Sequence, residues 1–156
     1  MHVNMDDLTL LRGIQDNLEK IEYESTILPK SETGSWDMLS VKFRNNREEI
    51  QSLVINVMPL SDDLEGSSFI QFYYEYPFFV PTPCPGELKT LIQNVNRQLP
   101  LGHFNTNLAW SQIYYKYVLA LSLKTTLIAD QLSDILDIII YSVQHFENEF
   151  SAFSRE

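Results

Sequence analysis

The sequence is poor in several residue types that particular protein classes require. It has one cysteine, Cys84, so an internal disulfide is impossible and the pattern of a small secreted scaffold is absent. Its five glycines form none of the glycine-rich loops that hold nucleotide phosphates. The longest apolar runs, such as 117–121 and 138–141, are far shorter than the roughly 20 residues that cross a membrane as a helix. We therefore expect no nucleotide cofactor and no membrane span.

Basic residues are also scarce. Eleven Lys and Arg stand against 21 Asp and Glu, which gives a net charge of −10 and a pI of about 4.6. Such a chain repels phosphate on average, so neither nucleic acid nor an anionic membrane is an expected partner. The first seven residues are acidic and polar where a signal peptide would be basic and then apolar, so the expected location is the cytoplasm.

Apolar residues, in contrast, are present in the amount that a folded domain needs. They make up 44% of the chain, aromatic residues make up 12%, and disordered sequences have far lower hydrophobicity. A length of 156 residues fits one domain with a substantial core. We therefore predict a single domain over 1–156.

The spacing of apolar residues predicts the secondary structure. Steps of three and four predict helices over 5–21, with Asn4 as its cap, 88–99 and about 127–150. Alternation or short apolar runs predict strands over 39–43, 53–58, 69–76, 104–110 and 113–121. The segment 26–29 is expected to be a short extended piece, and the proline-rich 77–86 a connector in which no strand continues.

These elements follow the order α-β-β-β-α-β-β-α. Short turns between consecutive strands predict an antiparallel sheet, and amphipathic helices must pack on it, so the fold class is α+β. The stripe of the second helix is a candidate self-association surface if the sheet leaves it uncovered.

The residues that carry chemistry are few and scattered. His2, His103 and His145 lack the spacing of a metal site, and no serine stands in a nucleophile motif. Cys84 precedes the second helix, whose N-terminus would lower a thiol pKa, but a small buried side chain is the alternative. The one enzymatic arrangement to consider joins Cys84, His103 and a carboxylate in a pocket. No catalytic residue, cofactor or metal ligand is assigned.

Aromatic residues crowd the segment 69–79, where adjacent strand positions point to opposite faces. Either helices cover both faces, or a dimer covers the excess, or the aromatic surface recognises a partner. Together with the second helix, this segment supplies the predicted partner-binding residues Phe69, Tyr73, Phe78, Phe79, Leu88, Ile92 and Val95.

One passage carries a family resemblance. The run 96–104, NRQLPLGHF, precedes a hairpin that ends in IYYKY at 113–117. It resembles the YbjN-like bacterial proteins, in which an asparagine, then a glycine and a phenylalanine, precede an aromatic-rich strand. Size, acidity and element order are also similar to the small type III secretion chaperones. The proline-rich connector 77–85 departs from the tight strand-to-helix link of these families.

The resemblance implies a non-enzymatic, generally dimeric protein, and the chaperones of this class wrap an extended segment of a client protein. The leading hypothesis is thus a homodimeric chaperone-like or regulatory adaptor that holds an extended or apolar polypeptide segment. The alternative is a small-molecule or lipid carrier with an apolar cavity between the sheet and the C-terminal helix.

Overall fold

The computed structural model describes residues 6–31, 36–58, 67–107, 109–122 and 127–155. The described strands are β1 (Ser25–Leu28), β2 (Met38–Arg44), β3 (Ile50–Val57), β4 (Ser67–Phe79), β5 (His103–Asn107) and β6 (Gln112–Ser122). The described helices are α1 (Asp7–Lys20), α2 (Gly86–Asn96), α3 (Ala129–His145) and the short α4 (Glu147–Ser151). The predicted α+β class is confirmed.

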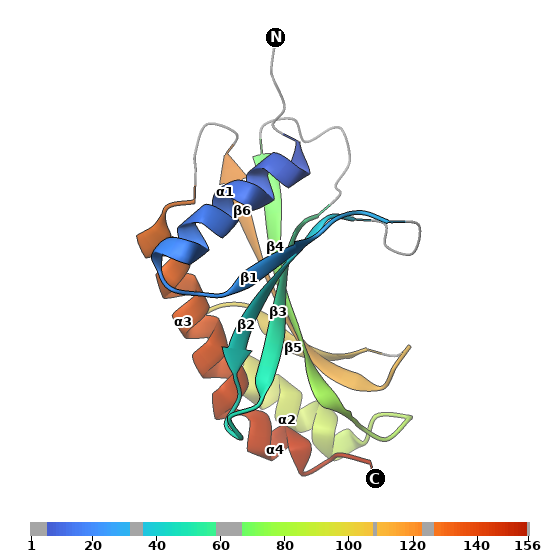
Figure 1. The fold of residues 1–156 in the computed structure, drawn as a ribbon. Helices are drawn as coiled ribbons and strands as arrows, with labels where there is room; N and C mark the ends of the chain where they lie inside the picture. The colour runs from blue at the N-terminus through green and yellow to red at the C-terminus, as the bar shows by residue number, and fades with distance from the viewer. Residues whose placement is uncertain (1–5, 32–35, 59–66, 108, 123–126, 156) are drawn as a thin grey trace.

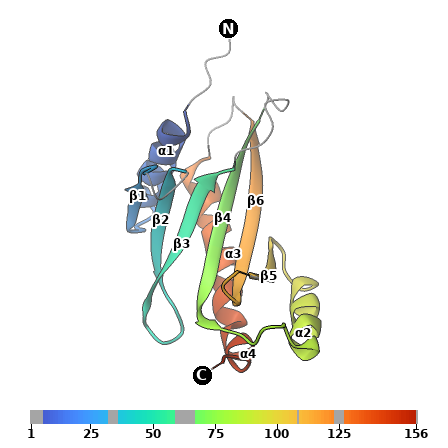
Figure 2. The ribbon, with the colours of Figure 1, turned by 90° about the vertical axis from the view of Figure 1, so that its right-hand side faces the viewer.

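The strands form one antiparallel sheet in the order β1-β2-β3-β4-β6-β5. The long strands β4 and β6 lie in the middle and pair over most of their lengths, from Ser67 with Ser122 to Phe79 with Gln112. The edge strands are short, four residues in β1 and five in β5. Figure 2 shows the strands side by side, with α3 passing behind them.

All the described helices lie on one side of this sheet (Figures 1 and 2). Alternate strand residues that face the helices are fully or almost fully buried, and cross-strand partners share that face, as Ile55 and Phe72 do. The helices add Leu11, Leu136 and Ile139 to the same core. We call this side the covered face and the opposite side the open face.

The first helix is tied to its neighbours by specific polar contacts. Its cap is Asp6, whose side chain accepts a hydrogen bond of 2.7 Å from the Thr9 backbone N–H; the predicted cap, Asn4, lies outside the described residues. Asn17 donates a hydrogen bond of 2.7 Å to the Leu127 carbonyl just before α3. These contacts fix the start of α1 and join the first helix to the last.

Three predicted boundaries are corrected. The segment 26–29 contains a true strand, β1, so the described order is α-β-β-β-β-α-β-β-α before the short α4. β4 continues through Pro77 to Phe79. Pairing between β4 and β6 is interrupted between Glu75 and Phe79, so Pro77 removes no hydrogen bond between these two strands. β5 ends at Asn107, and Trp110 lies in the following turn, 58% exposed.

The second helix is a candidate self-association surface only if its apolar stripe is uncovered, and the structure does not meet that condition. Leu88, Ile92 and Val95 are buried in the common core, with at most 7% of their surface exposed, and α2 packs beside β5. The protein's own core therefore covers this stripe. The third predicted helix is divided, because α3 ends at His145 and α4 follows from Glu147.

Candidate partner-binding face and edge

The open face carries aromatic and aliphatic residues that lie outside the buried core. Val54, Tyr73 and Lys116 occupy one row across β3, β4 and β6, and Phe69 pairs with Ala120 in another row. Of these, Ala120 is exposed and the others are half-buried. No described helix covers these side chains, so the excess of aromatic residues in β4 is divided between two faces and only one of them is covered.

A shallow depression of about 430 Å³ lies on the open face around Tyr73, Tyr114 and Lys116. The two tyrosine rings stack with centroids 5.4 Å apart, and the Tyr73 hydroxyl donates a hydrogen bond of 2.7 Å to Glu75 Oε2. Partial burial and the contact with Glu75 raise the pKa of Tyr73 above its ordinary value. The ring and hydroxyl of Tyr73 are therefore held in place and present a fixed aromatic wall.

Charge on the open face differs from charge on the whole chain. The strand positions that point to this face include Lys42, Arg44 and Lys116, with Glu75 as the one described carboxylate among them. His103 pairs with Lys116 across β5 and β6, and desolvation and the Lys116 charge lower its pKa, which favours the neutral imidazole. Glu24, just before β1, forms an ion pair of 3.6 Å with Lys42, so the described strands leave only a small positive excess on the open face, from Arg44 and Lys116 against Glu75. A neutral or weakly acidic polypeptide suits this face better than a basic one.

The second half of β6 forms a free sheet edge. Pairing between β5 and β6 ends with His103 and Lys116, whereas β6 continues to Ser122. Within the part of the chain that the structure describes, no strand lies on the outer side of Tyr117–Leu121, and Figure 2 shows β6 extending beyond β5. We call these five residues the free edge. Their sequence, YVLAL, is uncharged and has no proline, unlike the edges that proteins usually protect.

Gly102 lies directly before His103, the residue at which β5 begins. The φ of Gly102, +70°, is the left-handed conformation that glycine adopts without strain, and it turns the chain away from β6. A Cβ at this position would collide with the Tyr115 ring and would lie 2.7 Å from the Lys116 carbonyl oxygen. The turn at Gly102 therefore leaves the free edge without a neighbour on that side.

The structure separates the seven predicted partner-binding residues into three groups. Phe69 and Tyr73 lie on the open face, and Phe79, 48% exposed, lies at the end of β4. Phe78 is half-buried and stacks on Tyr76. The remaining three, from α2, are the buried residues described above. The prediction missed the free edge, because the lengths of β5 and β6 reveal it only once their register is known.

Cys84 and His103, the pair required by the enzymatic hypothesis, lie in different environments. Cys84 is half-buried against the core, and its Sγ lies 3.7 Å from the Pro85 carbonyl oxygen. His103 is exposed on the open face and contacts the edge of the Tyr114 ring. The structure does not bring these two residues into one site.

The interior between the sheet and α3 bears on the carrier alternative. Leu132, Leu136 and Ile139 on α3 are fully buried, and α3 contributes no residue to the lining of the depression on the open face. A small pocket beside the C-terminal helical segment lies at α4, where charged residues line it together with Pro77 and Phe78. The carrier alternative stays a prediction.

The described residues provide neither a metal-ligand cluster nor a membrane-spanning helix. Within the described ranges, no group of three or more His, Cys, Asp or Glu side chains gathers as a metal site would require. No described helix is both long enough and apolar enough to cross a bilayer. Comparisons with protein-family models and with curated proteins give no match for this chain.

Proposed function

We propose that the protein is a non-enzymatic binding module, a chaperone-like or regulatory adaptor, that holds an extended polypeptide segment along the free edge of β6. The observation that carries this proposal is the five-residue edge Tyr117–Leu121, which has no described strand on its outer side and borders the uncovered face. An extended segment would supply the backbone donors and acceptors that such an edge lacks. The type III secretion chaperone and YbjN resemblance agrees with this role but remains a prediction.

The side chains beside the edge suit such a segment. On the open face, Ala120 is exposed and Phe69 lies directly across from it on β4. On the covered face, Leu119 and Tyr117 are only partly buried against the core. Alternate side chains of an added strand would therefore meet apolar surface on both faces, which gives affinity without a catalytic group.

The test uses linear peptides selected from a displayed random library for binding to the intact protein. We expect Ala120→Lys to weaken binding of a selected peptide by about tenfold or more, because an edge lysine opposes strand addition. Thr26→Lys is the matched control, since Thr26 is also exposed on the open face but lies on β1 at the far edge. Phe69→Ala should weaken binding while leaving the fold intact.

Amide hydrogen exchange locates the bound peptide. Peptide binding should slow exchange within Tyr117–Leu121 in the wild-type protein and the Thr26→Lys variant. Equal binding by the Ala120→Lys variant, or protection confined to the helices, would contradict the proposal. If the same amides become protected by raising the protein concentration alone, a second copy occupies the edge and the peptide assignment is wrong.

The expected homodimer is a separate prediction. The oligomeric state must be measured directly. Analytical ultracentrifugation over a range of concentrations would show a mass above the 18.2 kDa of one chain if the prediction holds.

A further inference from the structure

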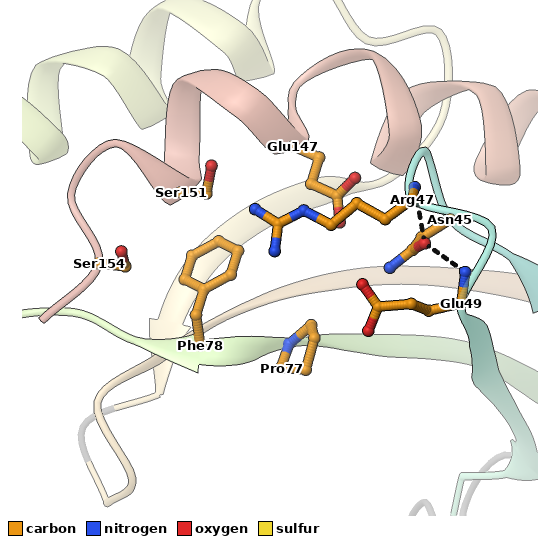
Figure 3. A pocket seen from close by; sticks show the side chains of 8 residues that line it. All are labelled: Asn45, Arg47, Glu49, Pro77, Phe78, Glu147, Ser151 and Ser154. Carbon is orange, nitrogen blue, oxygen red and sulfur yellow. Dashed lines mark hydrogen bonds between the residues drawn. The ribbon is translucent and has the colours of Figure 1, made fainter. Parts of the chain in front are cut away.

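A second and more enclosed pocket lies on the other side of the molecule. It has a volume of about 250 Å³ and lies between the β2–β3 turn, the end of β4 and α4. Figure 3 shows Arg47 and Glu49 reaching in from the turn, Phe78 forming one wall and Glu147 pointing down from α4. The turn is rigid, because Asn45 Oδ1 accepts hydrogen bonds of 2.9 Å from the backbone N–H groups of Arg47 and Glu49.

Glu147 is the unusual residue of this pocket. Only 6% of its surface is exposed, and its Oε2 is buried with no hydrogen-bond partner among the residues that the structure describes. The residue is drawn inward because Phe146 and Phe150, next to it on the same helical segment, are both core residues. A buried carboxylate oxygen without a partner destabilises a protein, and more so when the carboxylate is charged. The fold therefore maintains an unsatisfied acceptor at the pocket wall.

The charges that line the pocket are unpaired but of both signs. Arg47 and Glu147 share the pocket, yet neither takes part in an ion pair within 4.0 Å among the described residues, and the same is true of Glu49. The two carboxylates act on a common neighbour, because burial first and then the charges of Glu147 and Glu49 raise the pKa of Tyr74. The pocket thus presents two carboxylates and one guanidinium at separate positions.

We propose that this pocket binds a small zwitterion of the α-amino acid class. The ammonium group of the ligand is held by Glu147 and Glu49, and its carboxylate is held by the forked N–H donors of Arg47. Phe78 and Pro77 give the pocket an apolar wall for a ligand side chain. A single ligand of this kind offers an opposite charge both to the Glu147 carboxylate and to the unpaired Arg47, which a simple cation or a simple anion does not.

The size of the pocket limits the ligand. A volume of about 250 Å³ lies just below the roughly 300–1,000 Å³ that is usual for drug-sized ligands, so the pocket suits a molecule as small as one amino acid. The pocket is separate from the free edge of β6, since none of its lining residues belongs to that strand. The inference therefore stands independently of the proposed polypeptide binding.

Isothermal titration calorimetry with glycine, leucine and phenylalanine tests the proposal on the intact protein. We expect at least one of them to bind, while its N-acetyl form, which lacks the ammonium group, and its amide, which lacks the carboxylate, each bind at least tenfold more weakly. Glu147→Gln and Arg47→Ala should each reduce the affinity by a similar factor. Arg97→Ala is the matched control, because Arg97 is exposed at the end of α2 and outside the pocket.

Three results would overturn the proposal. The first is that none of the three amino acids binds. The second is equal binding of the amide and the free acid together with no effect of Arg47→Ala, which would indicate a plain cation site. The third is evidence that Arg47 and Glu147 form an ion pair with each other in solution. If a double-mutant cycle of Arg47→Ala and Glu147→Gln shows strong coupling in unfolding free energy and no ligand binds, the two residues satisfy each other.

Discussion

The two faces of the sheet are built from the same strands but perform different tasks. On β4, Phe72 and Tyr74 point to the covered face and are buried, whereas Phe69 and Tyr73 point to the open face and are only half-buried. The chemical types are nearly the same, and only the position along an alternating strand differs. Aromatic content alone therefore does not separate core from surface in this protein, and the separation follows from the placement of every described helix on one side.

The largest expected difference is between two phenylalanines on one strand. Phe72→Ala should lower the free energy of unfolding by about 3–5 kcal/mol, because Phe72 is fully buried, whereas Phe69→Ala should cost less than about 2 kcal/mol. Urea denaturation followed by far-UV circular dichroism measures both values. Similar costs for the two substitutions would mean that another molecule already covers the open face in solution, and the comparison between the faces would fail.

A smaller difference is expected between two adjacent tyrosines on β6. The Tyr115 hydroxyl donates a hydrogen bond of 2.7 Å to the Leu101 carbonyl oxygen, which fixes the chain before β5. Tyr115→Phe should therefore lower the free energy of unfolding by about 1 kcal/mol. Tyr114→Phe, on the open face, should change it by less than about 0.5 kcal/mol. An equal loss in both variants, measured by thermal and urea denaturation, would show that the open-face hydroxyl also has a structural partner.

The smallest expected effect concerns the acidic start of α1. The hydrogen bond from the Thr9 N–H lowers the pKa of Asp6, so its contribution to stability is complete above about pH 4 and is lost as the pH falls through the lower folded-state value. Asp6→Asn keeps an oxygen that caps the helix, and it should flatten the decline of stability at acidic pH.

Asp7 provides a control of opposite sign. Desolvation, followed by the charges of Asp37 and Asp6, raises its pKa, so its ionised form opposes folding at neutral pH. Asp7→Asn should slightly raise the melting temperature at neutral pH, and this gain should disappear in acid. Melting curves over a range of pH would contradict both assignments if the two variants changed stability in the same direction at every pH.

Much of the fold was predictable because its signals are local. The periodicity around Leu11, Leu53 and Leu136 predicts elements that the structure contains, and short turns predict antiparallel pairing. β1 was not predicted as a strand, because its four residues are too few to show an alternation of apolar and polar side chains. The continuation of β4 through Pro77 was not predictable from the sequence. Pro77 is tolerated because the register between β4 and β6 shifts between Glu75 and Phe79, and this register is known only from the structure.

The candidate sites depend still more on features that are not local. The free edge of β6 exists because Gly102 turns the chain away, and a glycine by itself does not specify the register in which two strands pair. Glu147 would be placed on the solvent side by its charge. It is buried because the helix breaks at Phe146 and resumes in a new direction, so its environment is set by tertiary packing.

The position of α3 at the end of the described chain has a consequence for biosynthesis. All six strands leave the ribosome before α3, and α3 supplies Leu132, Leu136 and Ile139 to the core. Until then, the open face and the part of the covered face that α3 later buries remain exposed, together with the uncharged YVLAL sequence. Productive folding therefore requires that α3 is completed and packed before the unfinished chain associates with other polypeptides.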